Sequence, residues 1–263
     1  MSGQLLIDAY RTLHCAMADP SRGSEDPADP ATVQAMQIAL HIPKQDPPKR
    51  GDLLAAAAQA VVAVCMDPRA GCEGEWRDAL AGWYGHRIRK IARRARGASW
   101  EHVQALPGCS AAHGTAQARA FIPSAVGDVP HDIAKLQIKG TDLPHEGGEV
   151  PTVEEIIAAP VPTVIIADSL GMSVGKAAAQ AGHAAMLLAA AMGEGWVLAW
   201  VEAGFPLVVH ELPDDVFNQV IADEATVVVQ DAGFTEVAPG SVTAAAYPGS
   251  FGDRTPESKA EVT

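Results

Sequence analysis

The sequence predicts an α/β protein whose small mixed β-sheets are flanked by helices. Residues 162–167, Pro-Thr-Val-Ile-Ile-Ala, are mostly apolar and carry no charge, which is typical of a strand buried on both faces. The alanine-rich segment that ends at residue 192 has the length and composition of a buried helix. A second buried strand is expected at 226–230, and the first half of the chain has its own strand at 36–42 followed by an apolar helix at 53–66.

The two halves of the chain predict the same order of elements. Each has a strand, an apolar helix, a helix that carries tryptophan (Trp76 or Trp196), a strand, a helix and a strand. We therefore hypothesise that residues 36–143, an accessory half, are a diverged and degenerate copy of residues 161–248. Two such units would pack as a pseudo-dimer within one chain; a homodimer of whole chains is the other assembly we expect.

Polar segments rich in proline and glycine set the expected boundaries. Residues 1–35 are predicted to be disordered or linker, apart from a short helix at 5–17, because residues 20–32 hold too little apolar surface to fold. Residues 144–160 are predicted to be a linker with one helical turn, and residues 249–263 a disordered tail.

Charge is divided unequally between the halves. The chain of 263 residues has a net charge of −13, but residues 1–143 hold 16 Lys and Arg against 15 Asp and Glu, whereas residues 144–263 hold 3 against 17. The halves therefore carry +1 and −14. Lys176 is the one cation of the second half that precedes its tail, which indicates a site rather than a solubilising surface.

Other features of the sequence bear on its compartment. No apolar run reaches the roughly 18 residues needed to cross a membrane. The first residues lack the cationic start and cleavage site of a signal peptide, and the four cysteines are scattered without C-x-x-C spacing. These features predict a cytoplasmic protein with free thiols and no membrane contact.

Three polar side chains interrupt the long alanine-rich helix. Lys176, Gln180 and His183 follow steps of four and three residues, so on an α-helix they fall within an arc of roughly 60°. A buried Lys, Gln and His need polar partners or a water-filled cleft, although for His183 a core position is an equally simple interpretation. The preceding turn, 171–175, is too short for a phosphate-binding P-loop and is followed by Ala177 where Ser or Thr would hold magnesium.

The loop after the strand at 226–230 is a second candidate site. Open α/β sheets place their ligands at the carboxyl ends of strands. This loop supplies a carboxylate at Asp231, an exposed backbone at Gly233 and a hydroxyl at Thr235. The alternative is a purely structural turn, because Asp-Ala-Gly and Pro-Gly are turn formers.

Residues 87–96 form the only dense basic block, with six cations in ten residues. Its apolar residues fit a helix, but the flanking glycines and the comparison of the halves favour a strand. Nucleic-acid affinity depends on neutralising phosphates, which the acidic second half cannot do. The block is therefore the candidate RNA-binding surface; alternatively, it pairs with the acidic half and holds the two halves together. The candidate residues are Arg87, Arg89, Lys90, Arg93 and Arg94.

Three stretches of the second half follow one another in a distinctive order. They are Gly-Met-Ser-Val-Gly-Lys-Ala-Ala-Ala-Gln-Ala-Gly-His-Ala-Ala from residue 171, Gly-Phe-Pro-Leu-Val-Val from residue 204, and Asp-Ala-Gly-Phe-Thr-Glu-Val-Ala-Pro-Gly-Ser-Val-Thr from residue 231. Over residues 161–248 the chain thereby resembles the type 2 peptidyl-tRNA hydrolase family. The basic block and the stretch at 135–144 also resemble longer actinobacterial members with an extra N-terminal region.

The resemblance implies a fold, a reaction and a set of site residues. The fold is a small mixed sheet flanked by helices. The reaction is hydrolysis of the ester that joins a peptide, or an N-blocked amino acid, to the 3′ ribose of tRNA, with peptidyl-tRNA as partner and without a metal or other cofactor. The family's catalytic lysine, aspartate and threonine fall on Lys176, Asp231 and Thr235, and Gln180 and His183 match residues that line the cleft.

One position departs from the family pattern. Relatives usually carry a second lysine where this chain has Val174, which an ideal helix turns away from Lys176. We expect Lys176 to stabilise the oxyanion while Asp231 takes a proton from water and Thr235 orients that water. The alternative from another class is a non-catalytic member that binds tRNA or a protein partner. A generic α/β domain of unknown role would require both motifs to be coincidental.

Overall fold

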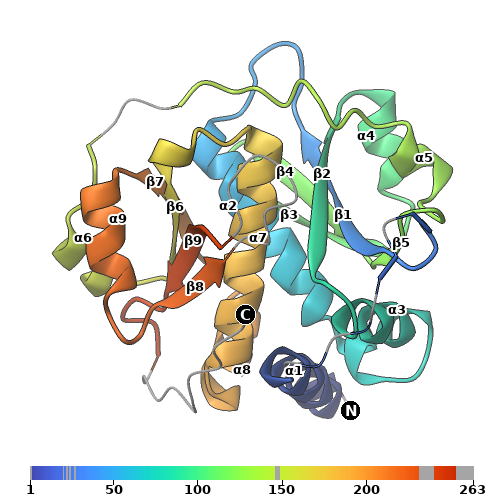
Figure 1. Ribbon diagram of the computed structural model, residues 1–263, viewed down its shortest axis with the longest axis horizontal. Coiled ribbons are helices and arrows are strands. Elements are labelled where there is room, and N and C mark those ends of the chain that lie inside the picture. The colour runs from blue at the N-terminus through green and yellow to red at the C-terminus, as the bar shows by residue number, and fades with distance from the viewer. Residues whose placement is uncertain are drawn as a thin grey trace.

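The computed structural model places two mixed β-sheets on either side of a central pair of helices, with further helices on the outer faces (Figure 1). The structure describes residues 2–19, 21, 23, 25–26, 28–145, 149–230 and 240–252. The first sheet is built from the first half of the chain and the second sheet from the second half. The expected α/β class with small mixed sheets is confirmed.

The first sheet has the strand order β2-β1-β4-β3, with the short β5 paired to β1. β1 pairs with β2 in parallel and with β4 antiparallel, and β3 pairs with β4 antiparallel. β1, β2 and β3 therefore all run in one direction. The strands are β1 (Gln34–His41), β2 (Arg89–Ala95), β3 (Gly108–His113), β4 (Ala116–Phe121) and β5 (Ser124–Ala125).

The second sheet repeats this arrangement strand for strand, in the order β7-β6-β9-β8. β6 pairs with β7 in parallel and with β9 antiparallel, and β8 pairs with β9 antiparallel. This is the agreement that the repeat hypothesis requires; a common origin of the halves remains our proposal. The strands are β6 (Thr163–Ala167), β7 (Val208–Leu212), β8 (Val227–Gln230) and β9 (Val242–Tyr247).

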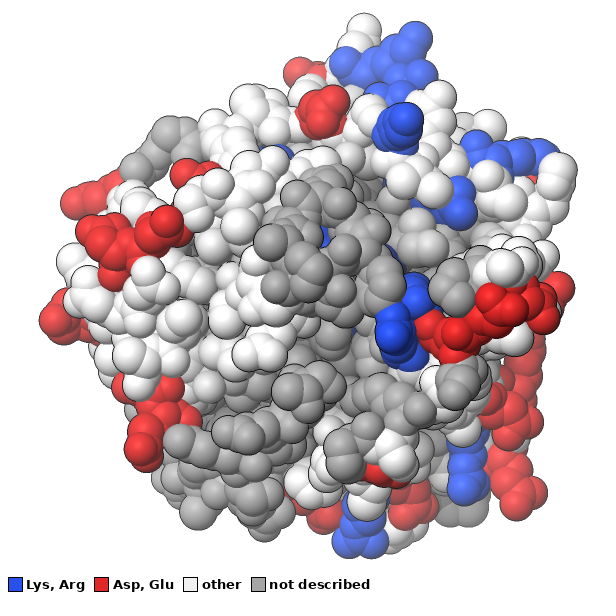
Figure 2. Space-filling view, in the orientation of Figure 1, with Lys and Arg blue, Asp and Glu red and all other residues white. Residues whose placement is uncertain are grey.

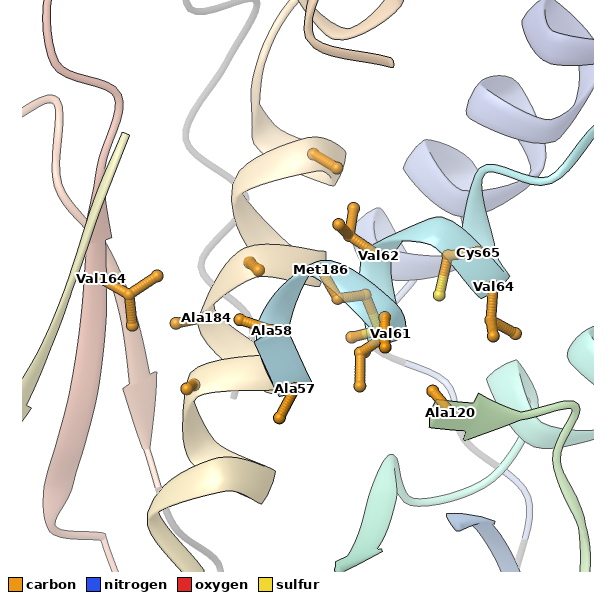
Figure 3. Packing of buried hydrophobic residues seen from close by; sticks show 14 of the residues in the cluster. Ala57, Ala58, Val61, Val62, Val64, Cys65, Ala120, Val164, Ala184 and Met186 are labelled. Atoms are coloured by element: carbon orange, nitrogen blue, oxygen red, sulfur yellow. The ribbon is translucent and has the colours of Figure 1, made fainter. Parts of the chain in front are cut away.

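Two apolar helices fill the space between the sheets. α2 (Arg50–Cys65) packs on β3 and β4 and reaches β7, while α7 (Val174–Ala191) packs on β8 and β9 and reaches β2. The helices also pack against each other, and Figure 3 shows Val61 of α2 beside Met186 of α7, with Ala120 of the first sheet and Val164 of the second on either side. One continuous apolar core therefore joins the two halves.

Short helices cover the outer face of each sheet. α4 (Ala98–Val103) and α5 (His131–Ala134) bury Trp100 and Ile133 on the first sheet. α6 (Val153–Ala158) and α9 (Asp214–Ile221) bury Ile156 and Phe217 on the second. The expected helical turn in the linker is thus confirmed as α6, which begins with a capping box between Thr152 and Glu155.

Three helices gather at the end of the molecule opposite the start of α7 (Figure 1). They are α1 (Ser2–Ala18), α3 (Glu75–Tyr84) and α8 (Glu194–Glu202). The short helix expected at 5–17 is present as α1, and its Tyr10, Leu13 and Met17 are buried in the common core. The apolar face of α1 stabilises it through this packing, which its polar neighbours in sequence do not reveal.

The remaining differences from the sequence prediction are local. The basic block forms a strand, β2, as the comparison of the halves favoured. The hairpin strand β3 was not expected, because its small residues are only partly buried and show weak alternation. Two 3₁₀ turns, η1 (Pro68–Gly71) and η2 (Asp168–Leu170), complete the described elements.

Within the described residues, one helical segment, Arg50–Gly71, is long and apolar enough to cross a membrane by those criteria alone. Its apolar window is 78% buried inside the fold, as expected of the helix at the centre of a folded core.

Candidate active site

The candidate site lies at the edge of the second sheet where α7 begins. β6, β7 and β8 run in the same direction, so their carboxyl ends meet at this edge. β6 leads through η2 and Gly171, whose φ of 52° suits glycine, into α7. Carboxyl edges of this kind are where open α/β sheets bind ligands.

The first turn of α7 carries the lysine that the sequence singled out. Ser173 caps the helix: its hydroxyl accepts a hydrogen bond of 3.2 Å from the Lys176 N–H. Thr141, near the end of the first half, accepts a bond of 3.2 Å from the Gly175 N–H. The Lys176 side chain is half-buried at this edge.

The expected polar stripe follows one face of the helix. α7 runs without interruption from Val174 to Ala191, so Gln180 and His183 lie on the face of Lys176. Gln180 is buried and His183 half-buried. Val174, in contrast, is fully buried in the common core at the first position of α7.

The three candidates on the loop after β8 lie outside the described residues. These are Asp231, Gly233 and Thr235. The described chain ends at Gln230, the last residue of β8, and resumes at Gly240 shortly before β9. Asp231 therefore follows directly on a strand whose carboxyl end is at the α7 edge.

A buried arginine that the sequence analysis did not single out lies at the same edge. Arg50, the first residue of α2, is 3% exposed and forms a two-point ion pair with Glu211 of β7, at 2.6 and 2.7 Å. It also donates to the carbonyl oxygen of Met172 at 2.8 Å and to that of Leu143 at 3.4 Å. His145 completes the cluster, 3.5 Å from the Glu211 carboxylate.

A signal for Arg50 was present in the sequence. A cation at the start of a helix opposes the helix dipole, so it needs a partner outside the helix. Arg50 stands directly before the Gly51 and Asp52 that mark the start of the predicted helix, but its partner Glu211 is too distant along the chain for local patterns to reveal.

Most side chains of the basic strand are engaged within the first half of the chain. Arg89 pairs with the buried carboxylate of Glu25. Arg93 donates to the Gln37 side-chain oxygen at 2.8 Å, and Arg94 hydrogen-bonds Gln137. Glu25, Gln37 and Gln137 all belong to the first half, so these contacts do not support the alternative in which this strand pairs with the acidic half.

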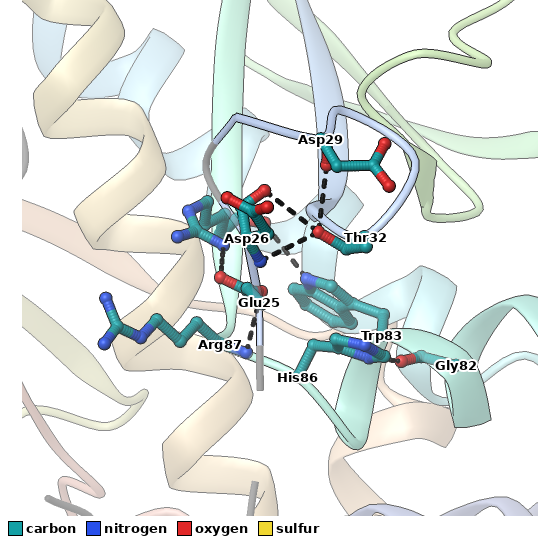
Figure 4. A network of polar contacts seen from close by, with 9 residues as sticks. Glu25, Asp26, Asp29, Thr32, Gly82, Trp83, His86 and Arg87 are labelled. Atoms are coloured by element: carbon teal, nitrogen blue, oxygen red, sulfur yellow. Dashed lines mark hydrogen bonds and ion pairs between the residues drawn. The ribbon is translucent and has the colours of Figure 1, made fainter. Parts of the chain in front are cut away.

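Arg87 and Lys90 differ from these arginines. The backbone N–H of Arg87 donates to Glu25 while its side chain is exposed and extends away from the network around Glu25 (Figure 4). The Lys90 amine lies 4.9 Å from the Trp83 ring centre and 3.7 Å from the Met186 sulfur. Arg87 is therefore the most accessible member of the predicted RNA-binding set.

Charge is distributed unequally on the face shown in Figure 2. Asp and Glu without neighbouring cations lie over the second sheet with α6 and α9, whereas Lys and Arg lie over the upper part of the first half, whose right and lower sides also carry Asp and Glu. An open hollow of about 590 Å³ beside β2 is lined by Arg93, Leu136, Ile138 and Lys139. The two cations that line this hollow, Arg93 and Lys139, both belong to the first half.

The neutral form of one histidine in the second sheet is favoured. Burial of the His210 ring on β7 lowers its pKa below the ordinary value of a histidine, because the charged form loses its hydration.

Comparison with known proteins identifies the second half. The model of the family described as Peptidyl-tRNA hydrolase PTH2 matches residues 161–250, close to the unit expected at 161–248. A peptidyl-tRNA hydrolase of Pyrobaculum aerophilum is 41% identical over 93 residues, which cover 31% of this chain and 78% of that relative. One from Sulfurisphaera tokodaii is 31% identical over 93 residues, 30% of this chain and 77% of the relative.

A third protein of the same name, from Metallosphaera sedula, is 35% identical over 95 residues, covering 31% of this chain and 80% of the relative. These relatives are matched over most of their own length and over about a third of this chain. The second half of the chain contains this match and carries Lys176 on the first turn of α7. Through this half, the chain belongs to the type 2 peptidyl-tRNA hydrolase family.

Proposed function

We propose that this protein hydrolyses peptidyl-tRNA, with the site at the α7 edge of the second sheet. The observation that carries this proposal is the family match over residues 161–250, within which Lys176 stands on the capped first turn of α7. A water molecule would attack the ester carbonyl and the bond to the ribose oxygen would break. The products are a free peptide carboxylate and a tRNA with its ribose hydroxyl restored.

Each proposed catalytic group has one role. The Asp231 carboxylate would take the proton from the attacking water, and the Thr235 hydroxyl would orient that water. The Lys176 ammonium would stabilise the negative charge that develops on the carbonyl oxygen. The proton held by Asp231 would pass to the departing ribose oxygen. Gln180, Gly233 and His183 would border the acyl group.

The first half offers independent support for bringing Lys176 and Asp231 together. Asp52 is the third residue of α2, as Lys176 is of α7, and its carboxylate is 3.9 Å from His113, at the end of β3. The matching place in the second half is the end of β8, which Asp231 follows. We infer that Lys176 faces the loop after β8 as Asp52 faces the turn after β3.

Turnover of an N-acetylated aminoacyl-tRNA tests the proposal. Replacing Lys176 by Ala or Asp231 by Asn should lower kcat by about 100- to 1000-fold, the usual effect of losing one such group. Arg77→Ala, which alters an exposed arginine on α3, is the matched control and should retain full activity. Unchanged turnover in both site variants would overturn the assigned roles.

We propose that tRNA phosphates bind the basic block, residues 87–96. The acidic second half cannot neutralise phosphates, and this block is the densest run of cations in the sequence. Affinity for tRNA should fall steeply with salt, and Arg87→Ala should lower the slope of log Kd against log salt. Arg77→Ala, at an exposed arginine of α3, is the control. An unchanged slope in Arg87→Ala would exclude that residue from the interface.

A non-catalytic member that binds tRNA or a protein partner is the second candidate, favoured by Val174 at the position of the family's second lysine. The turnover assay decides between the two.

We further propose a cytoplasmic site of action, where translation supplies the substrate. The paired halves would replace a dimer, so sedimentation should find a monomer; a stable homodimer would contradict that expectation.

A further inference from the structure

We propose that the first half of the chain is a positioning device for Lys176, acting through Thr141 and Arg50 on the first turn of α7. The inference rests on the proposed function, and it assigns a role to residues that lie outside the matched segment 161–250. Both residues come from the part of the chain that precedes the second sheet. Thr141 contacts the backbone of Gly175, the residue before Lys176, and Arg50 contacts that of Met172, four residues before it.

Thr141 holds the start of the helix directly. The first N–H groups of a helix have no partner within it, and Thr141 satisfies that of Gly175, the residue before Lys176. Thr141 is 2% exposed, so the bond is shielded from water. A Cβ added to Gly175 would lie 3.3 Å from the Thr141 hydroxyl and 3.8 Å from Ala92 of β2. The helix start is therefore seated closely against the first half.

Arg50 fixes the turn that precedes the helix. Its guanidinium donates to the carbonyl oxygen of Met172, in the connection between η2 and α7. The same group is locked in place by the two-point pair with Glu211 and by the Leu143 carbonyl. A planar fork with several fixed partners has little freedom, so it sets the position of Met172 and of the turn that follows.

The rest of α7 is held against the first half as well. Gly182 approaches α2 so closely that an added Cβ would lie 2.7 Å from a methyl group of Val61. At the C-terminal end of α7, the Tyr10 hydroxyl donates to the Met192 carbonyl oxygen at 2.9 Å. His14 Nδ1 lies 2.8 Å from the carbonyl oxygen of Ala190. The helix therefore cannot shift along its axis without breaking contacts with the first half.

The consequence concerns rate rather than substrate affinity. Lys176 acts on charge that appears only in the transition state, so displacing it lowers kcat while leaving KM nearly constant. A misplacement of about 1 Å caused by a distant mutation can cost roughly 100-fold in rate. Loss of one tether should cost less, because Ser173 still caps the helix.

Thr141→Val tests the first tether because it keeps the shape of the side chain and removes the hydroxyl. We expect kcat for N-acetylated aminoacyl-tRNA to fall about 10-fold, within the range that misplacement can produce, with KM within twofold. Thr141→Ser should restore the wild-type kcat. Thr152→Val removes a corresponding hydroxyl at the start of α6 and is the matched control for lost helix capping. Its kcat should be unchanged.

The contact between Arg50 and the Met172 carbonyl is tested with a double variant. Replacing Arg50 alone leaves Glu211 buried without its partner and risks unfolding. Arg50→Met combined with Glu211→Met removes both charges, keeps apolar bulk and still breaks the tether to Met172. We expect kcat to fall about 10-fold with an intact fold, for the same positional reason. The control is Arg11→Met with Glu194→Met, which removes the exposed pair between α1 and α8.

Amide NMR of the full-length protein separates this proposal from the proposed function. The Gly175 and Lys176 amide signals should shift in Thr141→Val and in the Arg50 double variant, but not in either control. If the wild-type protein has no turnover, the proposed function fails and these signals still test the positioning. Unmoved signals, or a kcat that falls equally in Thr152→Val, would overturn the positioning role.

Discussion

The two halves of this chain share one topology but differ in the residues at matching positions. At the third position of the central helix the first half has Asp52 and the second half Lys176. After the third strand, the first half turns back within a short hairpin at Gly114, and the second half has the longer connection that begins at Asp231. The comparison shows that the shared scaffold fixes where a site can be, while a few side chains decide whether it holds a cation or a carboxylate.

The first residues of the two central helices, α2 and α7, differ in the same way. Arg50 and Val174 each begin a central helix, and both are buried. Arg50 is accommodated because Glu211 and two carbonyl groups satisfy its guanidinium. Val174 packs within the apolar core. A charged group is therefore compatible with one helix start and not with the other.

The largest expected effect comes from placing a charged residue at the first position of α7, as Arg50 is at the first position of α2. Val174→Lys would place an ammonium group in apolar surroundings, and we expect it to lower the free energy of unfolding by about 3 kcal/mol or more. Val174→Met, of similar length without charge, is the control in urea unfolding. Equal stability of the two variants would show that the lysine escapes to water.

The next largest effect concerns two helical glycines, one in each half. Gly182→Ala should destabilise by about 1 to 3 kcal/mol, because the new methyl group meets Val61 at 2.7 Å. Gly82 in α3 has no atom within 4 Å of an added Cβ, so Gly82→Ala should stabilise by about 0.5 to 1 kcal/mol through helix propensity. Thermal unfolding measures both. Adding Val61→Ala to Gly182→Ala should recover stability; failure to do so would place the strain elsewhere.

A smaller effect distinguishes two half-buried histidines. Burial lowers the pKa of His41 on β1 and of His210 on β7, and at His41 the carboxylate of Glu101 opposes this. The unfolded chain, with its ordinary pKa of about 6.5, then binds more protons, so stability is full above that pH and declines as pH falls toward the folded pKa. Urea unfolding should show this decline, and His210→Gln should reduce it more than His41→Gln. An unchanged decline in both variants would contradict this assignment.

Local sequence patterns were sufficient for much of the fold and for part of the site. Buried strands and apolar helices have strong periodic signals, and Lys176 was conspicuous because it interrupts such a helix. The roles of Thr141 and Arg50 depend on contacts with Gly175 and Glu211, 34 and 161 residues away, which no local period encodes. Composition also could not show that Arg89 is committed to Glu25, because a paired and an unpaired arginine look alike in sequence.

The smallest expected effect is the sharpest test of the comparison. Asp52 occupies the place of Lys176 in the first half, and it faces His113, so a second catalytic site there is the obvious rival idea. A carboxylate cannot stabilise an oxyanion as an ammonium can, so Asp52→Asn should leave kcat for N-acetylated aminoacyl-tRNA within about twofold of wild type. A 10-fold loss with unchanged thermal stability would mean that both helix starts take part in the reaction. Parallel measurement of Lys176→Ala ensures that the assay detects the site in the second half, and the contrast between the two variants then decides whether the repeated topology carries one active site or two.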